Sequence, residues 1–112
     1  DLGIIKDSKQ EAIDTGEYSK YYMHRIGHWL GMDVHDVGSY KQDGDWRDLE
    51  PGMVMTIEPG IYILDSLEGV EDKWKGIGVR IEDDVLVTKK GFEVLTPDIP
   101  RSIEEVESTV QS

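Results

Sequence analysis

Short apolar runs separated by turn-forming residues constrain the fold of this chain more than any other feature of its sequence. These runs cover residues 53–57, 61–64, 78–82, 85–88 and 92–95. The first run is followed by Glu58-Pro59-Gly60, and the last two are joined by Lys89-Lys90-Gly91, a connection typical of a hairpin. We interpret Asp83-Asp84 as a turn or bulge. The pattern predicts a mainly antiparallel sheet.

Short helices are expected on either side of these strands. The capping-box pattern, a Ser followed three residues later by Glu, occurs twice, at Ser8/Glu11 and at Ser102/Glu105. The first predicts a helix over residues 9–15 that Gly16 ends, followed by a helical turn over 17–21. The second predicts one or two helical turns over 102–106. The expected fold class is therefore α+β, with residues 1–112 in one domain.

Charge and composition exclude several classes of function. The chain carries 12 Lys and Arg against 24 Asp and Glu, a net charge of −12, which would repel nucleic-acid phosphates. It has no cysteine, so disulfides and thiolate metal sites are excluded. It has no apolar run of about 20 residues and no signal-peptide pattern at its start. We expect no nucleic-acid partner, no membrane insertion and a cytoplasmic location.

The three histidines, His24, His28 and His35, lie within twelve residues, interleaved with glycines. Each glycine inside a helix costs about 1 kcal/mol, so a continuous helix here is not expected. His24 and His28 have the spacing of the zinc motif H-E-x-x-H, but Arg25 stands where that motif needs its Glu, so the zinc-protease interpretation fails. Two interpretations stay open: half-buried loop histidines, or a functional site.

Two strand-associated carboxylates are the other candidates. Glu58 ends an apolar run, where a buried carboxylate needs a partner or a metal; alternatively, the strand ends earlier and Glu58 points to solvent. Alternation places Arg80 and Glu82 on one face of a strand, either in a site or as an ordinary surface ion pair. Carboxylates with one or two imidazoles favour a hard or borderline divalent ion such as Mn²⁺.

Three ordered motifs carry a resemblance to a known family. They are Tyr22–Gly38, Leu49–Tyr62 and Gly76–Asp84. With these motifs, the chain resembles the C-terminal part of the Xaa-Pro aminopeptidase (aminopeptidase P) family, dinuclear metallopeptidases of the pita-bread fold. The resemblance implies that residues 1–112 are the C-terminal portion of a pita-bread catalytic domain. The first half of that domain, and an N-terminal domain, would then be absent from this chain.

The resemblance also implies a metal site. His28 corresponds to the single histidine ligand, Glu58 to a carboxylate ligand that also handles the protons of the attacking water, and Glu82 to the carboxylate that bridges two metals. The family usually binds Mn²⁺. Its two aspartate ligands have no counterpart in this chain, so we expect the 112 residues alone to hold Mn²⁺ poorly and to be inactive.

Further residues match catalytic positions of the family. His24 and His35 correspond to the histidines that steady the scissile carbonyl and the tetrahedral intermediate, and Arg80 to an arginine that braces the site. Arg25 departs from the family, which commonly has Gly there. Two alternatives stay open: a positive φ at this position would strain an arginine, or, without such a φ, its side chain adds a cation near the cleft.

The implied activity is hydrolysis of the bond between an N-terminal residue and a following proline. The alternatives are an Xaa-Pro dipeptidase (prolidase) and a non-catalytic binding or dimerisation module. The implied partners are peptides with proline at the second position. An isolated half domain would expose a sheet edge and an apolar face, so we also expect a homo-oligomer.

Overall fold

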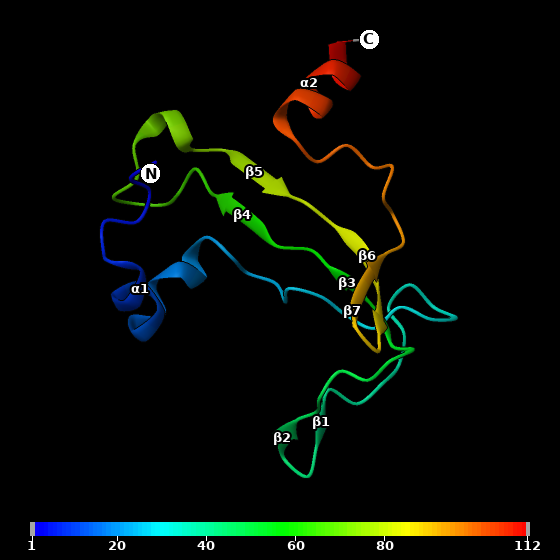
Figure 1. Ribbon diagram of the computed structural model, residues 1–112. Coiled ribbons are helices and arrows are strands. Elements are labelled where there is room, and N and C mark those ends of the chain that lie inside the picture. Colours follow the sequence, from blue (N-terminus) through cyan, green and yellow to red (C-terminus); the bar gives the residue numbers. More distant parts are fainter. Residues whose placement is uncertain (1, 112) are drawn as a thin grey trace. The chain divides into compact units, whose positions relative to one another are not determined.

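The computed structural model describes residues 2–111, which form two compact units. The first unit contains residues 2–25 and 59–80, and the second contains residues 26–58 and 81–111. Each unit is therefore built from two separate stretches of the chain, and each has its own antiparallel strands (Figure 1).

The helices of the first unit follow the predicted capping signals. The unit contains α1 (Lys9–Thr15), the 3₁₀ helices η1 (Glu17–Lys20) and η2 (Asp72–Trp74), and the strands β4 (Gly60–Ile63) and β5 (Ile77–Arg80). The Ser8 hydroxyl accepts a hydrogen bond from the Glu11 backbone N–H, and the Glu11 carboxylate accepts one from the Ser8 N–H. Gly16 ends α1 at φ 73°, a left-handed conformation that glycine adopts without strain. The first capping box and its helix are thus confirmed.

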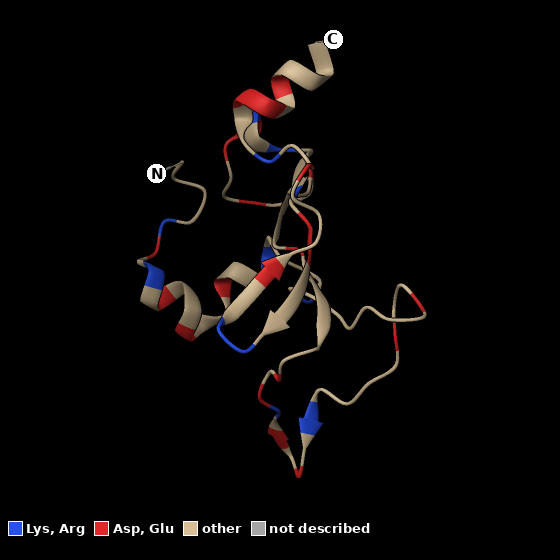
Figure 2. Ribbon diagram, turned by 45° about the vertical axis from the view of Figure 1, so that its right-hand side comes forward, with Lys and Arg blue, Asp and Glu red and all other residues tan. Residues whose placement is uncertain are grey.

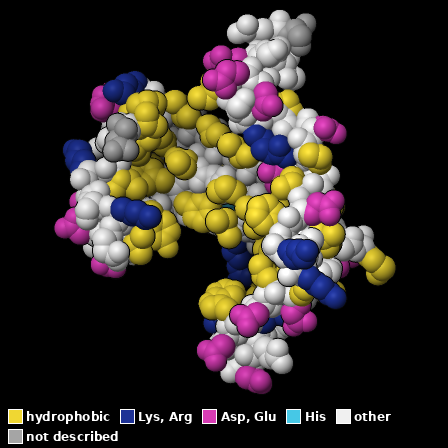
Figure 3. Space-filling view, in the orientation of Figure 1, with side chains coloured by type: hydrophobic (Ala, Val, Ile, Leu, Met, Phe, Trp, Pro, Cys, Tyr) yellow, Lys and Arg dark blue, Asp and Glu magenta, His cyan; other side chains and the backbone are white. Residues whose placement is uncertain are grey.

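Strands β4 and β5 pair antiparallel, from Gly60 opposite Arg80 to Ile63 opposite Ile77. The core of this unit is small: Tyr21, Ile63 and Val70 are buried, and the partly buried side chains packed around them are Ile4, Ile5, Leu67 and Trp74. Ile61 and Val79 on the same strands are 55% and 56% exposed. Hydrophobic side chains accordingly reach the surface in broad groups (Figure 3).

The second unit is organised around a three-stranded sheet. Its elements are β1 (Lys41–Gln42), β2 (Asp45–Trp46), β3 (Val54–Ile57), β6 (Asp83–Thr88), β7 (Gly91–Val94) and α2 (Ile103–Gln111). The sheet has the order β3-β6-β7, antiparallel throughout, and the predicted hairpin at Lys89-Lys90 is confirmed. The two-residue strands β1 and β2 form a separate hairpin.

Helix α2 is longer than the one or two turns predicted over 102–106: it continues to Gln111. Its capping box is confirmed: the Glu105 N–H donates to the Ser102 hydroxyl, and the Ser102 N–H donates to the Glu105 carboxylate. The first turn is acidic (Figure 2), which suits the positive end of the helix dipole. Among residues 2–111, no helix has the length and apolar character of a membrane span.

The prediction that Asp83 and Asp84 form a turn or bulge is wrong. They are the first two residues of β6 and pair with Ile57 and Thr56 of β3. Asp83 is held by charge-assisted hydrogen bonds from Arg101, which offset the poor strand propensity of aspartate. The interruption lies instead at residues 81–82, so Arg80 and Glu82 are not on one continuous strand.

Candidate metal centre

The segment that carries His28 runs along the edge of β3 that β6 does not use. Trp29 forms an antiparallel bridge with Met55. Backbone hydrogen bonds with N···O distances of 2.7–3.1 Å flank this bridge, from Leu30 N to Val54 O, from Thr56 N to His28 O and from Glu58 N to Ile26 O. Residues 26–30 therefore act as an irregular additional strand, and they bring His28 alongside the end of β3.

Gly27 makes this close approach possible. A Cβ atom at Gly27 would lie 2.0 Å from the backbone oxygen of Thr56, far inside contact distance. Any side chain here would push the segment away from β3, so glycine is needed at position 27 because it has no Cβ atom.

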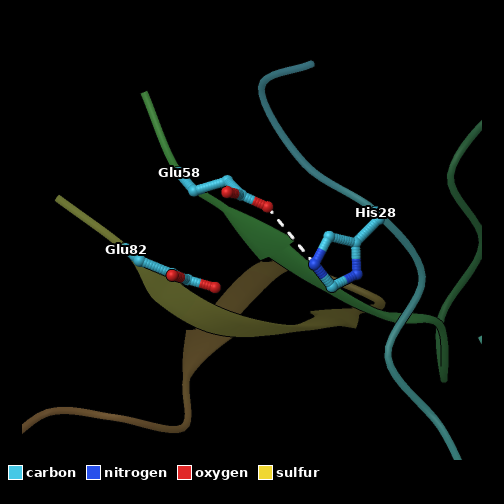
Figure 4. Close-up of side chains that lie close together, drawn as sticks. All are labelled: His28, Glu58 and Glu82. Carbon is cyan, nitrogen blue, oxygen red and sulfur yellow. Dashed lines mark ion pairs between the residues drawn. The ribbon is translucent and has the colours of Figure 1, made fainter. Parts of the chain in front are cut away.

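The register of β3 and β6 brings the two candidate carboxylates together. Ile57, the last residue of β3, pairs with Asp83, the first residue of β6. Glu58 follows Ile57 and Glu82 precedes Asp83, so both leave the sheet at the same end. His28, Glu58 and Glu82 each offer one ligand atom, and these atoms all lie within 4.8 Å of one another (Figure 4).

The orientation of the His28 ring is fixed by a backbone carbonyl. Its Nδ1 lies 3.0 Å from the carbonyl oxygen of Trp29, which can only accept, so Nδ1 is the donor. Nε2 then points at Glu58 Oε1, 3.3 Å away, with the His28 and Glu58 side chains only 20% and 12% exposed. Histidines that ligate a metal through one ring nitrogen usually donate a hydrogen bond from the other nitrogen to a carbonyl or carboxylate, as Nδ1 of His28 does here.

The donor set fits a divalent metal ion. In neutral His28 the Nε2 atom carries a lone pair, so two electron-rich atoms face each other at 3.3 Å unless a proton or a cation lies between them. An ion with bonds of about 2.1 Å keeps neighbouring ligand atoms about 3.0–3.4 Å apart. Two carboxylates and one imidazole suit a borderline or hard divalent ion.

The other predicted catalytic residues are distributed between the two units. His35 belongs to the second unit, and its ring centroid lies 4.4 Å from that of His28. His24 belongs to the first unit, where Nδ1 lies 2.8 Å from the Arg25 carbonyl oxygen and Nε2 lies 2.8 Å from Tyr62 Oη. Arg80, also in the first unit, is the last residue of β5.

Arg25 is not strained by the backbone. Asp43 is the non-glycine residue with a positive φ within the described part of the chain, and Arg25 is not among such residues. The departure from glycine at position 25 therefore costs no left-handed conformation.

Sequence reasoning missed Thr56, which is 2% exposed and bonds to two members of the cluster. The available signal was its position two residues before Glu58 in an apolar strand, since residues two apart share a face. Tyr62, the partner of His24, was also missed, and no short-range pattern points to that pairing.

Comparisons with known proteins show which family the chain resembles in sequence and fold. Residues 2–89 match the model of metallopeptidase family M24. The chain is 52% identical to an Xaa-Pro aminopeptidase of Haemophilus influenzae over 96% of its own length and 25% of the relative. The structure of Pseudomonas aeruginosa aminopeptidase PepP matches with a TM-score of 0.92 and 55% identity, covering 98% of this chain and 25% of that one.

A structure of Escherichia coli aminopeptidase P with the inhibitor Pro-Leu also matches, with a TM-score of 0.87 and 48% identity over 96% of this chain and 24% of the other. The chain thus spans about a quarter of the length of the relatives it matches. The predicted fold, part of the pita-bread fold of aminopeptidase P, is confirmed by these likenesses. With the M24 match covering most of its residues, the chain belongs to metallopeptidase family M24.

Proposed function

We propose that this chain supplies part of the active site of an Xaa-Pro aminopeptidase, which hydrolyses the bond between an N-terminal residue and a following proline. The observation that carries the proposal is the convergence of His28, Glu58 and Glu82 at one end of the β3–β6 pair. The likeness to aminopeptidase P structures supports the reaction class. The Pro-Leu inhibitor of the E. coli relative supports proline on the leaving side of the scissile bond.

His28 Nε2 and the carboxylates of Glu58 and Glu82 would hold the metal, and their donor chemistry favours Mn²⁺. When bound, the metal would lower the pKa of a water molecule and polarise the scissile carbonyl. Because three ligands do not complete a two-metal site, we propose that residues 1–112 are the C-terminal portion of a larger catalytic domain. The missing carboxylates, two aspartates in the family, would come from the preceding half. The 112 residues alone should then be inactive and bind Mn²⁺ weakly.

The residues that correspond to catalytic positions of the family would orient the substrate and move protons. Glu58 would accept a proton from the attacking water and deliver it to the leaving proline nitrogen. His35, packed against His28, would donate a hydrogen bond to the substrate carbonyl. His24 would steady the tetrahedral intermediate, in an orientation held by Tyr62 and the Arg25 carbonyl, and Arg80 would brace the site.

The experiment that tests this function uses the whole protein that contains this chain, assayed with Mn²⁺ on matched peptides. An X-Pro-X tripeptide should be cleaved after its first residue, and an X-Ala-X tripeptide should not. Cleavage of X-Pro dipeptides alone would indicate a prolidase. The absence of turnover on any peptide would favour a non-catalytic module and would sink the proposal.

Glu82→Gln provides the internal control, because it removes one negative ligand with little change in volume. Its activity should fall by more than the 10–100-fold that is typical when a hydrogen-bond partner of a metal ligand is replaced, because Glu82 would be a ligand itself. Sedimentation of the 112-residue chain alone would test the expected homo-oligomer, since a stable compact monomer would contradict it.

A further inference from the structure

The hydroxyl of Thr56 contacts two members of the metal cluster, His28 and Glu58. Thr56 Oγ1 is 3.0 Å from Glu58 Oε1 and 3.0 Å from the backbone nitrogen of His28. Thr56 is 2% exposed, and it is the fully buried polar side chain of the described residues. The hydroxyl is therefore shielded from water, and its hydrogen bonds are made to the protein.

The direction of both hydrogen bonds is fixed by chemistry. The backbone N–H of His28 can only donate, so Oγ1 accepts from it. The single hydroxyl proton is then directed to Glu58 Oε1, which as a carboxylate oxygen accepts. Glu58 Oε1 is also the oxygen that faces His28 Nε2 at 3.3 Å. One hydroxyl thus ties the carboxylate of one candidate ligand to the backbone of another.

The strand itself does not require this hydroxyl. The backbone N–H of Thr56 is satisfied by His28 O, and its neighbours in β3 are apolar. Valine has the same shape and a high strand propensity, and burying a hydroxyl costs free energy unless it is bonded. A buried threonine here is better explained by its two partners than by packing.

We infer that Thr56 is a positioning residue of the metal centre, whose hydroxyl holds the Glu58 carboxylate in register with His28. The inference rests on the proposed function, because it requires His28 and Glu58 to be ligands. Without the hydroxyl, the Glu58 carboxylate would lose the hydrogen bond that links it to the His28 backbone, and more of the metal-binding free energy would be spent on orienting it.

The test uses the whole protein and measures Mn²⁺ affinity by competition with a chelating dye. Thr56→Val should weaken Mn²⁺ binding by about 10–100-fold, the range typical for outer-shell partners of metal ligands. The thermal midpoint of the metal-free variant should fall modestly, because the His28 backbone N–H loses its acceptor; the Mn²⁺ affinity is the readout that reports on the position of Glu58. Thr88→Val, the same change at the end of β6 away from Glu82, is the matched control and should bind Mn²⁺ as the wild type does.

A second pair isolates the hydroxyl from the methyl group. Thr56→Ser and Thr56→Ala both lack the methyl, and only the serine variant keeps the hydroxyl. Thr56→Ser should bind Mn²⁺ at least tenfold more tightly than Thr56→Ala. This pair also decides the question if Thr56→Val does not fold.

The outcomes separate this inference from the proposed function. If the wild-type protein binds no Mn²⁺, both are overturned. If the wild type binds Mn²⁺ and Thr56→Val and Thr56→Ala bind it equally well, only the role of Thr56 is overturned. The same holds if Thr56→Ser is as weak as Thr56→Ala.

Discussion

The guanidinium group of Arg101 donates hydrogen bonds to the Asp83 carboxylate, with Nε 2.9 Å from Oδ1 and 2.8 Å from Oδ2. The same guanidinium donates to the backbone oxygen of Pro97. Asp83 also accepts from the Thr96 hydroxyl at 2.9 Å. Arg101 lies just before α2 and Asp83 begins β6, so this contact ties the C-terminal segment to the strand that follows Glu82.

Replacing Arg101 with Gln should therefore loosen α2 and the start of β6 together. The variant loses the charge-assisted hydrogen bonds to Asp83, and amide hydrogen exchange should speed up in Ile103–Gln111 and at Asp83. Arg101→Lys keeps the charge but lacks the planar fork, so its exchange should be intermediate. If Arg101→Gln exchanges at the wild-type rate throughout α2, this contact does not hold the helix.

Gly27→Ala should separate residues 26–30 from β3. The added Cβ would lie 2.0 Å from the Thr56 oxygen, so the segment must shift or β3 must distort. We expect a loss of about 1–3 kcal/mol in the free energy of unfolding, the usual cost of overpacking, together with weaker Mn²⁺ binding.

Gly44→Ala is the comparison for Gly27→Ala. Gly44 has φ 95°, and a Cβ added there would have no atom within 4 Å, so its substitution strains the β1–β2 hairpin alone. It should lower stability and leave Mn²⁺ affinity unchanged. Thermal unfolding and dye competition on both variants measure the difference, and equal Mn²⁺ affinities for the two would contradict the crowding argument.

Local sequence signals predicted the elements whose determinants are close in the chain. Both capping boxes and the hairpin at Lys89-Lys90 depend on residues within a few positions of each other, and the structure contains all of them. The strand position of Asp83 was missed because Arg101, 18 residues away, supplies the compensating contact. The contact of Thr56 with Glu58 is local, whereas its contact with the His28 backbone spans 28 residues and has no local signal.

For the candidate site too, local sequence signals identify the residues, whereas their convergence depends on non-local pairing. His28, Glu58 and Glu82 could be named from motifs, but their convergence depends on the β3–β6 register and on residues 26–30 pairing with β3. Such pairings are non-local, and side-chain alternation within one strand does not specify them. Alternation in fact placed Arg80 and Glu82 on one strand, where the structure has a break.

The order of α2 should depend on pH through Glu105. Backbone hydrogen bonds from Ser102 and then Arg101 hold the pKa of this carboxyl below its ordinary value of 4.5. A lowered folded-state pKa means that the stabilisation is fully present above the ordinary value and is lost as the pH falls through the folded value. The Ser102 amide chemical shift should therefore titrate below pH 4.5. In Glu105→Gln this transition should disappear, and its persistence would assign the titration to another group.

Metal addition should stabilise the whole protein, and the gain should require Glu82. A ligand that binds only the folded state raises its stability by about 2.7 kcal/mol at 100 times the dissociation constant, so the thermal midpoint should climb with Mn²⁺ concentration and fall back on chelation. Glu82→Gln removes one of the three converging carboxylate and imidazole ligands and should flatten this dependence. Glu93→Gln makes the same change on β7 of the same sheet, outside the cluster, and should keep the full shift. If both variants respond to Mn²⁺ like the wild type, the ion binds elsewhere, and the convergence of His28, Glu58 and Glu82 does not form its site.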